Sequence, residues 1–134
     1  MASTESHKST VKELVEDLNE KIKLGLLVKR QKIVGFAASE ASTNLFAFFL
    51  HKKELISPGF NVNHKFFASV TRAQTVFKDD FEEKNKILNL LVEQEKFRDL
   101  LCYGKDKDEK IVLEAVKNLF ELKQLIEKIL GEEL

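Results

Sequence analysis

The chain has 134 residues with 22 basic and 22 acidic side chains, so its formal net charge is zero. This balance argues against a protein that binds nucleic acid by bulk electrostatics, because that interaction grows with the number of phosphates neutralised. A single cysteine excludes an intramolecular disulfide, and the longest apolar run, residues 45–50, is far shorter than a membrane span, so we expect a cytoplasmic protein without a membrane segment.

Five helical segments are expected in chain order, because one proline and five glycines leave few interruptions. The first begins at Ser9 or Thr10, either of which can cap it, and keeps helical apolar spacing as far as Ile22. The second runs from about residue 26 to 55 and ends before a Pro-Gly turn. Residues 1–8 are expected to be disordered, which leaves residues 9–134 as one domain.

The remaining three segments follow from local signals. The third spans about residues 62–77, and the fourth opens at Asp80, which with Glu83 has the spacing of a capping box. The fifth follows Asp108 as its cap and has the clearest apolar period, which includes Leu119 and Leu122. Together these segments predict an all-α fold, an antiparallel bundle of four to five helices.

Residues 35–44 are unusually rich in small side chains for a helix. We expect them to mark a close crossing with another helix, in which Ser39 or Ser42 bonds back to the preceding turn. A niche for a small molecule is the alternative. Ile33 and Phe36 are expected, like most of the eleven phenylalanines, on inner faces that fill the core.

The polar side chains show no ligand spacing for a metal ion, since the one cysteine and three histidines are scattered. We expect no metal and no cofactor. His64 follows the Pro-Gly turn at the start of the third segment, where a histidine is usually solvated or bridges a loop. Basic residues that include Lys65 and acidic residues at 79–83 segregate on the surface, which fits plain solvation or self-complementary docking in a symmetric dimer.

The most informative run is residues 97–105, near the end of the fourth segment. Arg98 lies there among apolar residues, and a buried guanidinium must find partners because its charge cannot be removed. The run resembles the Arg-Asn-x-x-x-His signature of HEPN domains, but Asp99 stands in place of the asparagine and Tyr103 in place of the histidine. The resemblance implies a HEPN-like bundle in which these three residues lie in a cleft between two copies, with binding residues at His64, Lys65 and Lys105.

Tyr103 stands where the HEPN signature has histidine, and this difference decides the expected function. Imidazole exchanges protons near neutral pH, whereas a phenol, with a pKa near 10 in model peptides, is a poor general base at pH 7. The resemblance therefore implies a catalytically inactive or weak HEPN-like module, expected to be a homodimer. Its expected ligands are a protein such as a nucleotidyltransferase in a toxin–antitoxin system, an RNA or a nucleotide.

Two alternatives stay open at this point. The first is an active, metal-independent endoribonuclease that uses Arg98 and Tyr103, so whether the protein is an enzyme is not decided. The second is a plain helical dimerisation or adaptor protein that resembles HEPN domains only because short bundles look alike. For Arg98 itself, the structural alternative is that it pairs with Asp99 or Glu95 and holds the helix end in a dimer contact.

Overall fold

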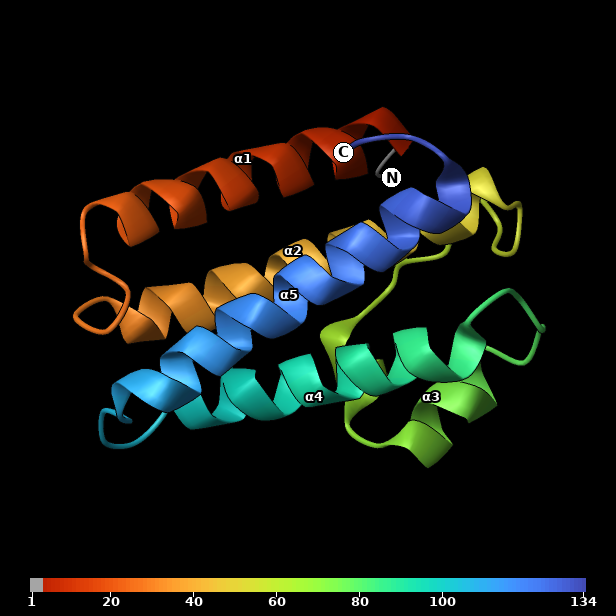
Figure 1. The fold of residues 1–134 in the computed structure, drawn as a ribbon. Helices are drawn as coiled ribbons and strands as arrows, with labels where there is room; N and C mark the ends of the chain where they lie inside the picture. The colour runs from red at the N-terminus through yellow and green to blue at the C-terminus, as the bar shows by residue number, and fades with distance from the viewer. Residues whose placement is uncertain (1–3) are drawn as a thin grey trace.

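The computed structural model describes residues 4–134, which fold into α-helices and one short 3-10 helix, with no strand among them (Figure 1). The all-α bundle predicted from the apolar spacing is therefore confirmed. In chain order the elements are α1 (Thr4–Lys23), α2 (Gln31–Lys52), η1 (His64–Phe67), α3 (Val70–Val76), α4 (Lys84–Cys102) and α5 (Glu109–Leu130).

Helix α2 occupies the centre of the bundle. Its backbone is in close contact with α1, α4 and α5, and Figure 1 shows α1 on one side of it, α4 on the other and α5 crossing in front. Within the described residues, the backbone of α1 approaches no helix other than α2. The short elements η1 and α3 pack against α4. Most candidate site residues lie beside the contact between α2 and α4, which we call the α2–α4 seam.

The composition of α2 explains its central position. Small and apolar residues cover nearly all its sides, and a helix of this kind is stable in water only when it is buried. By length and composition alone α2 could cross a membrane, and residues 4–134 contain no other such helix. However, 78% of its apolar window is buried in the bundle, as expected for the core helix of a folded domain.

Phenylalanine rings fill the end of the core near the C-terminus of α2. Phe46 contacts Phe77 edge-on at 5.0 Å between ring centroids, and Phe67 stacks on Phe77 at 5.8 Å. Phe49 and Phe81 complete the group at 5.4 Å. Edge-to-face and offset ring pairs of this kind stabilise a core beyond the area that they bury. The predicted core role of the phenylalanines is confirmed for these rings.

The small residues of α2 form the close helix crossing that the sequence predicts. Gly35 lies against Leu101 and Cys102 of α4, so close that a Cβ on Gly35 would stand 2.7 Å from the Cβ of Leu101. Ser42 donates a hydrogen bond back to the Ala38 carbonyl at 2.9 Å, as predicted. The α2–α4 seam is therefore tight where these residues meet.

Helix α1 begins at Thr4, earlier than the predicted start at Ser9 or Thr10. Of the segment expected to be disordered, residues 4–8 are therefore helical, and residues 1–3 lie outside the described part of the chain. Tertiary contacts explain the difference, because His7 Nδ1 lies 2.8 Å from Asn44 Oδ1 and Lys8 lies 3.9 Å from Glu132. The sequence around residues 4–8 carries no apolar period that would reveal these contacts.

The third predicted helix is interrupted. Instead of one helix over residues 62–77, η1 and α3 are separated at Ser69, whose hydroxyl caps α3 by accepting from the Arg72 amide at 3.1 Å. The predicted capping box at Asp80 is also wrong, because α4 begins at Lys84 and the Asp80 carboxylate accepts from the amide of Phe81. Ser69 separates the two short helices. The apolar pattern over residues 62–77 does not show where such a break lies.

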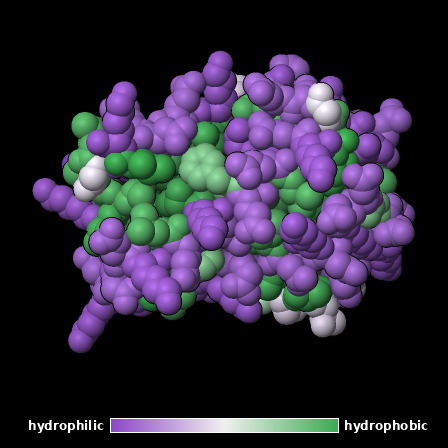
Figure 2. Space-filling model, in the orientation of Figure 1, coloured by the Kyte–Doolittle hydropathy of each residue, from purple (hydrophilic) through white to green (hydrophobic). Residues whose placement is uncertain are grey.

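Apolar side chains also reach the surface. Figure 2 shows a mostly hydrophilic face on which apolar groups gather towards the end where α1 finishes and α5 begins. The exposed apolar residues of these chain segments are Ile22, Leu24 and Leu113. On α2, Ile33 and Phe36 were expected in the core, but they are 51% and 49% exposed. They form an outward strip on an otherwise buried helix.

Candidate functional site

Arg98 is bound within its own chain. Its Nη1 donates to Ser39 Oγ at 3.1 Å and to Glu40 Oε1 at 3.2 Å, both on α2. The guanidinium carbon also lies 5.0 Å from the centroid of the Phe36 ring, in a cation–π arrangement. Only 11% of the side chain is exposed. One arginine of α4 therefore contacts three residues on neighbouring turns of α2 and joins the two helices.

The expected partners of Arg98 are wrong. Asp99 lies on the exposed side of α4, and the carboxylate of Glu95 is bound elsewhere. A neighbouring residue on a helix points about 100° away, so Asp99 is poorly placed to share a partner with Arg98. Glu40 neutralises the guanidinium instead, from a position 58 residues earlier in the chain.

His64 and Glu95 form a second polar contact on the same helix. The Nδ1 atom of His64 lies 3.0 Å from both carboxylate oxygens of Glu95. Because a carboxylate accepts hydrogen bonds, Nδ1 donates and Nε2 is left as the other ring nitrogen. Asn63 positions η1 by accepting from the Lys65 amide at 2.9 Å. Of the two roles expected for His64, solvated or loop-bridging, this pair shows the second.

The six predicted site residues do not converge on one cleft. Glu95 and Arg98 are one turn apart on α4, so His64 and Arg98 lie beside the same seam. Tyr103 follows the end of α4 with 63% exposure, and within residues 4–134 no hydrogen bond or ring contact joins it to Arg98. Lys65 and Lys105 are exposed at separate places, η1 and the loop after α4.

Sequence reasoning missed the α2 side of this site. Ser39 and Glu40 were assigned to a close helix crossing, with a small-molecule niche as the alternative, and Phe36 to the core. One signal was present, because Phe36 and Glu40 are four residues apart and therefore share a helix face. The bond from Arg98 shows that this face also meets α4.

Cys102 lies on the same seam and is not poised as a nucleophile. Its Sγ is 3.4 Å from the carbonyl oxygen of Lys32. Burial raises the pKa of the Cys102 thiol, and the opposing effect of Arg98 is smaller. Because the thiolate is the reactive form, this thiol is a weak nucleophile near neutral pH.

Carboxylates outnumber cations where these residues meet. Glu40 is paired with Arg98, Glu95 accepts a hydrogen bond from His64, and Asp99 adds a further negative charge. A phosphate group approaching the seam would displace Glu40 from Arg98 or stay near uncompensated carboxylates. Among residues 4–134, no three histidine, cysteine or acidic side chains are grouped as metal ligands.

Comparison with known proteins gives no match to a family model, a curated protein or a solved structure. The resemblance to HEPN domains therefore rests on the residues and on the order of the helices.

Proposed function

We propose that this protein is a cytoplasmic, HEPN-like helical module without ribonuclease activity, which acts by binding protein, first of all a second copy of itself. The observation that carries the proposal is the bond between Arg98 and Glu40. An arginine that stabilises a transferring phosphate must be free to meet it, and here the guanidinium is buried against a carboxylate and a ring. Tyr103 supplies no imidazole in its place.

The outward strip of α2 supports self-association. Phe36 lies in its middle, with Lys32 one turn before it and Glu40 one turn after it. In a two-fold pairing of antiparallel α2 helices centred on Phe36, each Lys32 would lie opposite Glu40 of the second copy. A two-fold interface must be self-complementary, and the order Lys32, Phe36, Glu40 supports this by placing opposite charges on either side of one apolar ring. In the single chain these two charges pair with Asp106 and Arg98, so a dimer would share those ion pairs.

A protein ligand fits the seam better than RNA or a nucleotide does. The half-exposed ring of Phe36 and the aliphatic side chain of Ile33 are typical of interface centres, whereas the carboxylates of the seam oppose phosphate. A nucleotidyltransferase-like partner, as in a toxin–antitoxin pair, would bind the same module as a dimer. This assignment follows from the resemblance to HEPN domains.

Light scattering tests the dimer. The wild-type protein is expected to have the mass of two chains at micromolar concentration, and Phe36→Glu the mass of one. Leu24→Glu is the matched control, because it places the same charge on another exposed apolar position and should stay dimeric. Circular dichroism verifies that each variant is folded. A wild-type mass of one chain at all concentrations, or a dimer lost in Leu24→Glu but kept in Phe36→Glu, contradicts the proposal.

An assay for cleavage of structured RNA tests the proposed absence of ribonuclease activity. Wild-type protein should leave the RNA intact, since the loss of a positioned general acid–base typically removes about 10²–10⁴ in rate. Tyr103→His is the informative gain-of-function variant, because it restores the residue that the HEPN signature contains. Robust cleavage by the wild type that disappears in a folded Arg98→Ala variant would overturn the proposal.

An active endoribonuclease is the second candidate, and the His64–Glu95 pair favours it. A carboxylate that holds Nδ1 orients the imidazole and leaves Nε2 as the free ring nitrogen, and this carboxylate, Glu95, lies one helical turn from Arg98. The discriminating variant is His64→Gln. If wild-type protein cleaves RNA and folded His64→Gln does not, His64 is the base and the second candidate replaces the first.

A further inference from the structure

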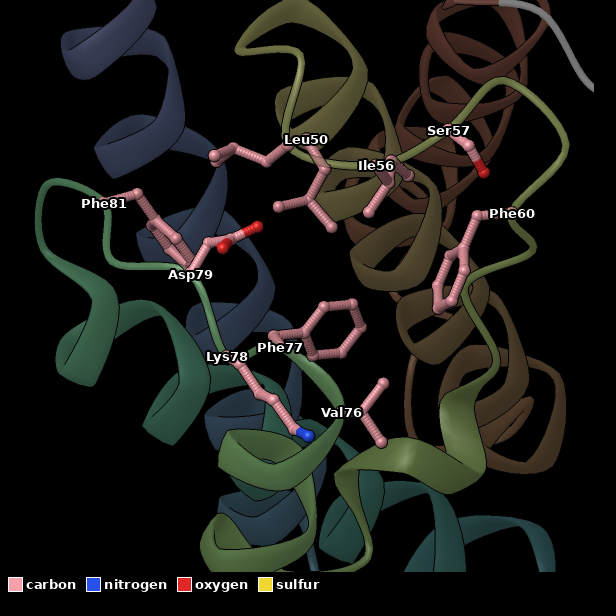
Figure 3. A pocket seen from close by; sticks show the side chains of 10 residues that line it. Leu50, Ile56, Ser57, Phe60, Val76, Phe77, Lys78, Asp79 and Phe81 are labelled. Atoms are coloured by element: carbon pink, nitrogen blue, oxygen red, sulfur yellow. The ribbon is translucent and has the colours of Figure 1, made fainter.

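A cavity of about 250 Å³ lies at the other end of α2 from Phe36. It is a partly open pocket bordered by the C-terminal end of α2, the loop that follows it, and the segment between α3 and α4 (Figure 3). From Phe36 to Leu50, a lining residue, α2 rises by about 21 Å at 1.5 Å per residue. The cavity is therefore separate from the α2–α4 seam, and a ligand bound in it would be independent of the proposed function.

The walls of this cavity are mostly apolar, with Ser57, Lys78 and Asp79 as the polar residues, and several of the rings are packed against neighbours. Phe60, Phe77 and Phe81 contribute rings, and Leu50 and Ile56 contribute aliphatic side chains. Phe77 is fixed by ring contacts to its neighbours, including Phe60 at 6.1 Å, and Phe81 is fixed by Phe49 at 5.4 Å. A pocket whose walls are already packed binds a ligand without first ordering its own side chains.

The volume limits the size of the ligand. An engineered apolar cavity of about 150 Å³ accepts benzene, so a space of this size accommodates an apolar body of about six to ten carbon atoms. The cavity is larger than a water molecule requires, and apolar walls give water few hydrogen-bonding partners. An organic ligand fits it better than ordered water does.

The charged side chains at the cavity determine which polar group a ligand should carry. In Figure 3 the carboxylate of Asp79 points towards the space between Leu50 and Phe77, whereas the ammonium of Lys78 lies away from it, towards the lower edge of the view. Asp79 has no hydrogen bond or ion pair with any other residue in the described part of the chain. It is therefore available to a cation.

The aromatic walls favour a cation for a second reason. The faces of phenylalanine rings carry partial negative charge and attract ammonium groups. Phe81 already does so in this protein, since the Lys84 ammonium lies 5.8 Å from its centroid. A ring surface beside an unpaired carboxylate is a suitable environment for an organic amine.

We propose that this cavity binds a small amphiphilic amine, with its alkyl or aryl body among Phe60, Phe77 and Phe81 and its ammonium group at Asp79. The apolar body supplies most of the affinity, because the walls are apolar. The carboxylate supplies the selectivity for an amine over an acid of the same length. The opposite preference, for a carboxylate ligand bound by Lys78, is the competing outcome.

Titration with three probes of equal length tests this proposal: hexylamine, hexanol and hexanoate. Binding is followed by NMR shifts of the amides that line the cavity. Hexylamine should bind most tightly and hexanoate most weakly. In Asp79→Asn the affinity for hexylamine should fall about two- to fivefold while that for hexanol stays unchanged, as expected for loss of one exposed charge pair.

Two further variants complete the test. Glu82→Gln removes a nearby exposed carboxylate that does not line the cavity and should bind hexylamine as the wild type does. Ile56→Phe fills the cavity and should abolish binding of all probes, with the melting temperature showing that the variant is folded. Tighter binding of hexanoate, equal losses in Asp79→Asn and Glu82→Gln, unchanged binding in folded Ile56→Phe, or no shift with any probe would each overturn the proposal.

Discussion

Replacement of Gly35 by alanine tests the tight packing between α2 and α4. The added Cβ would stand 2.7 Å from the Cβ of Leu101 and 3.2 Å from the Sγ of Cys102. Leu101 is buried, and its Cβ is attached directly to the backbone, so relief requires that one helix move. The substitution therefore sets a steric cost against the ordinary preference of a helix for alanine.

The two effects can be compared. Alanine in place of glycine inside a helix stabilises by up to about 1 kcal/mol, whereas overpacking a core costs about 1–3 kcal/mol. Because the clash is with a Cβ rather than with the end of a flexible side chain, we expect the upper part of that range. The net result should be a loss of about 1–2 kcal/mol in the free energy of unfolding.

Urea denaturation followed by circular dichroism measures this loss. With a slope of about 2 kcal/mol per molar urea, the unfolding midpoint should fall by roughly 0.5–1 M. Gly59→Ala is the matched control, because Gly59 has open space around its Cβ position and no positive φ. It should change stability by less than about 0.5 kcal/mol. A Gly35→Ala protein as stable as the wild type would refute the argument.

Two further predictions concern α5 and the histidine at the end of α2. Leu119→Ala should lower the free energy of unfolding by about 2–5 kcal/mol, because Leu119 is fully buried, whereas Leu113→Ala on the exposed side of α5 should cost far less in the same urea titration. The folded-state pKa of His51 lies below its ordinary value, because burial disfavours the imidazolium and His7 stacked on it adds repulsion. The unfolded chain thus takes up the proton first, and thermal stability should fall as the pH drops from about 6.5 to the folded-state pKa, with a smaller fall in His51→Gln. Equal pH dependence of the two proteins would show that His51 is not responsible.

The sequence predicts a helix correctly where a continuous apolar period and a capping residue mark the same segment. Helix α5 has a continuous apolar period, and Asp108 caps it by accepting from the Ile111 amide at 3.3 Å, as the sequence indicates. The outward strip on α2 was not predictable. That helix is apolar on nearly every side, so no periodicity separates Phe36 from the buried rings.

The candidate site was predictable only in part. The sequence indicates that Arg98 needs partners, but the partners lie 58 and 59 residues away, at Glu40 and Ser39. Spacing along one helix cannot reveal a contact between helices that are so far apart in the chain. The same limit applies to Glu95, whose partner His64 comes from η1.

The position of α1 affects the dynamics of the molecule. Since its backbone approaches α2 and no other helix among the described residues, an opening of α1 would break its packing on α2 and leave the packing of α2, α4 and α5 on one another in place. Such a partial opening requires less free energy than global unfolding, and amide hydrogens of α1 would then exchange with solvent before those of α2. The bundle would behave as a stable three-helix unit with one outer helix that opens on its own.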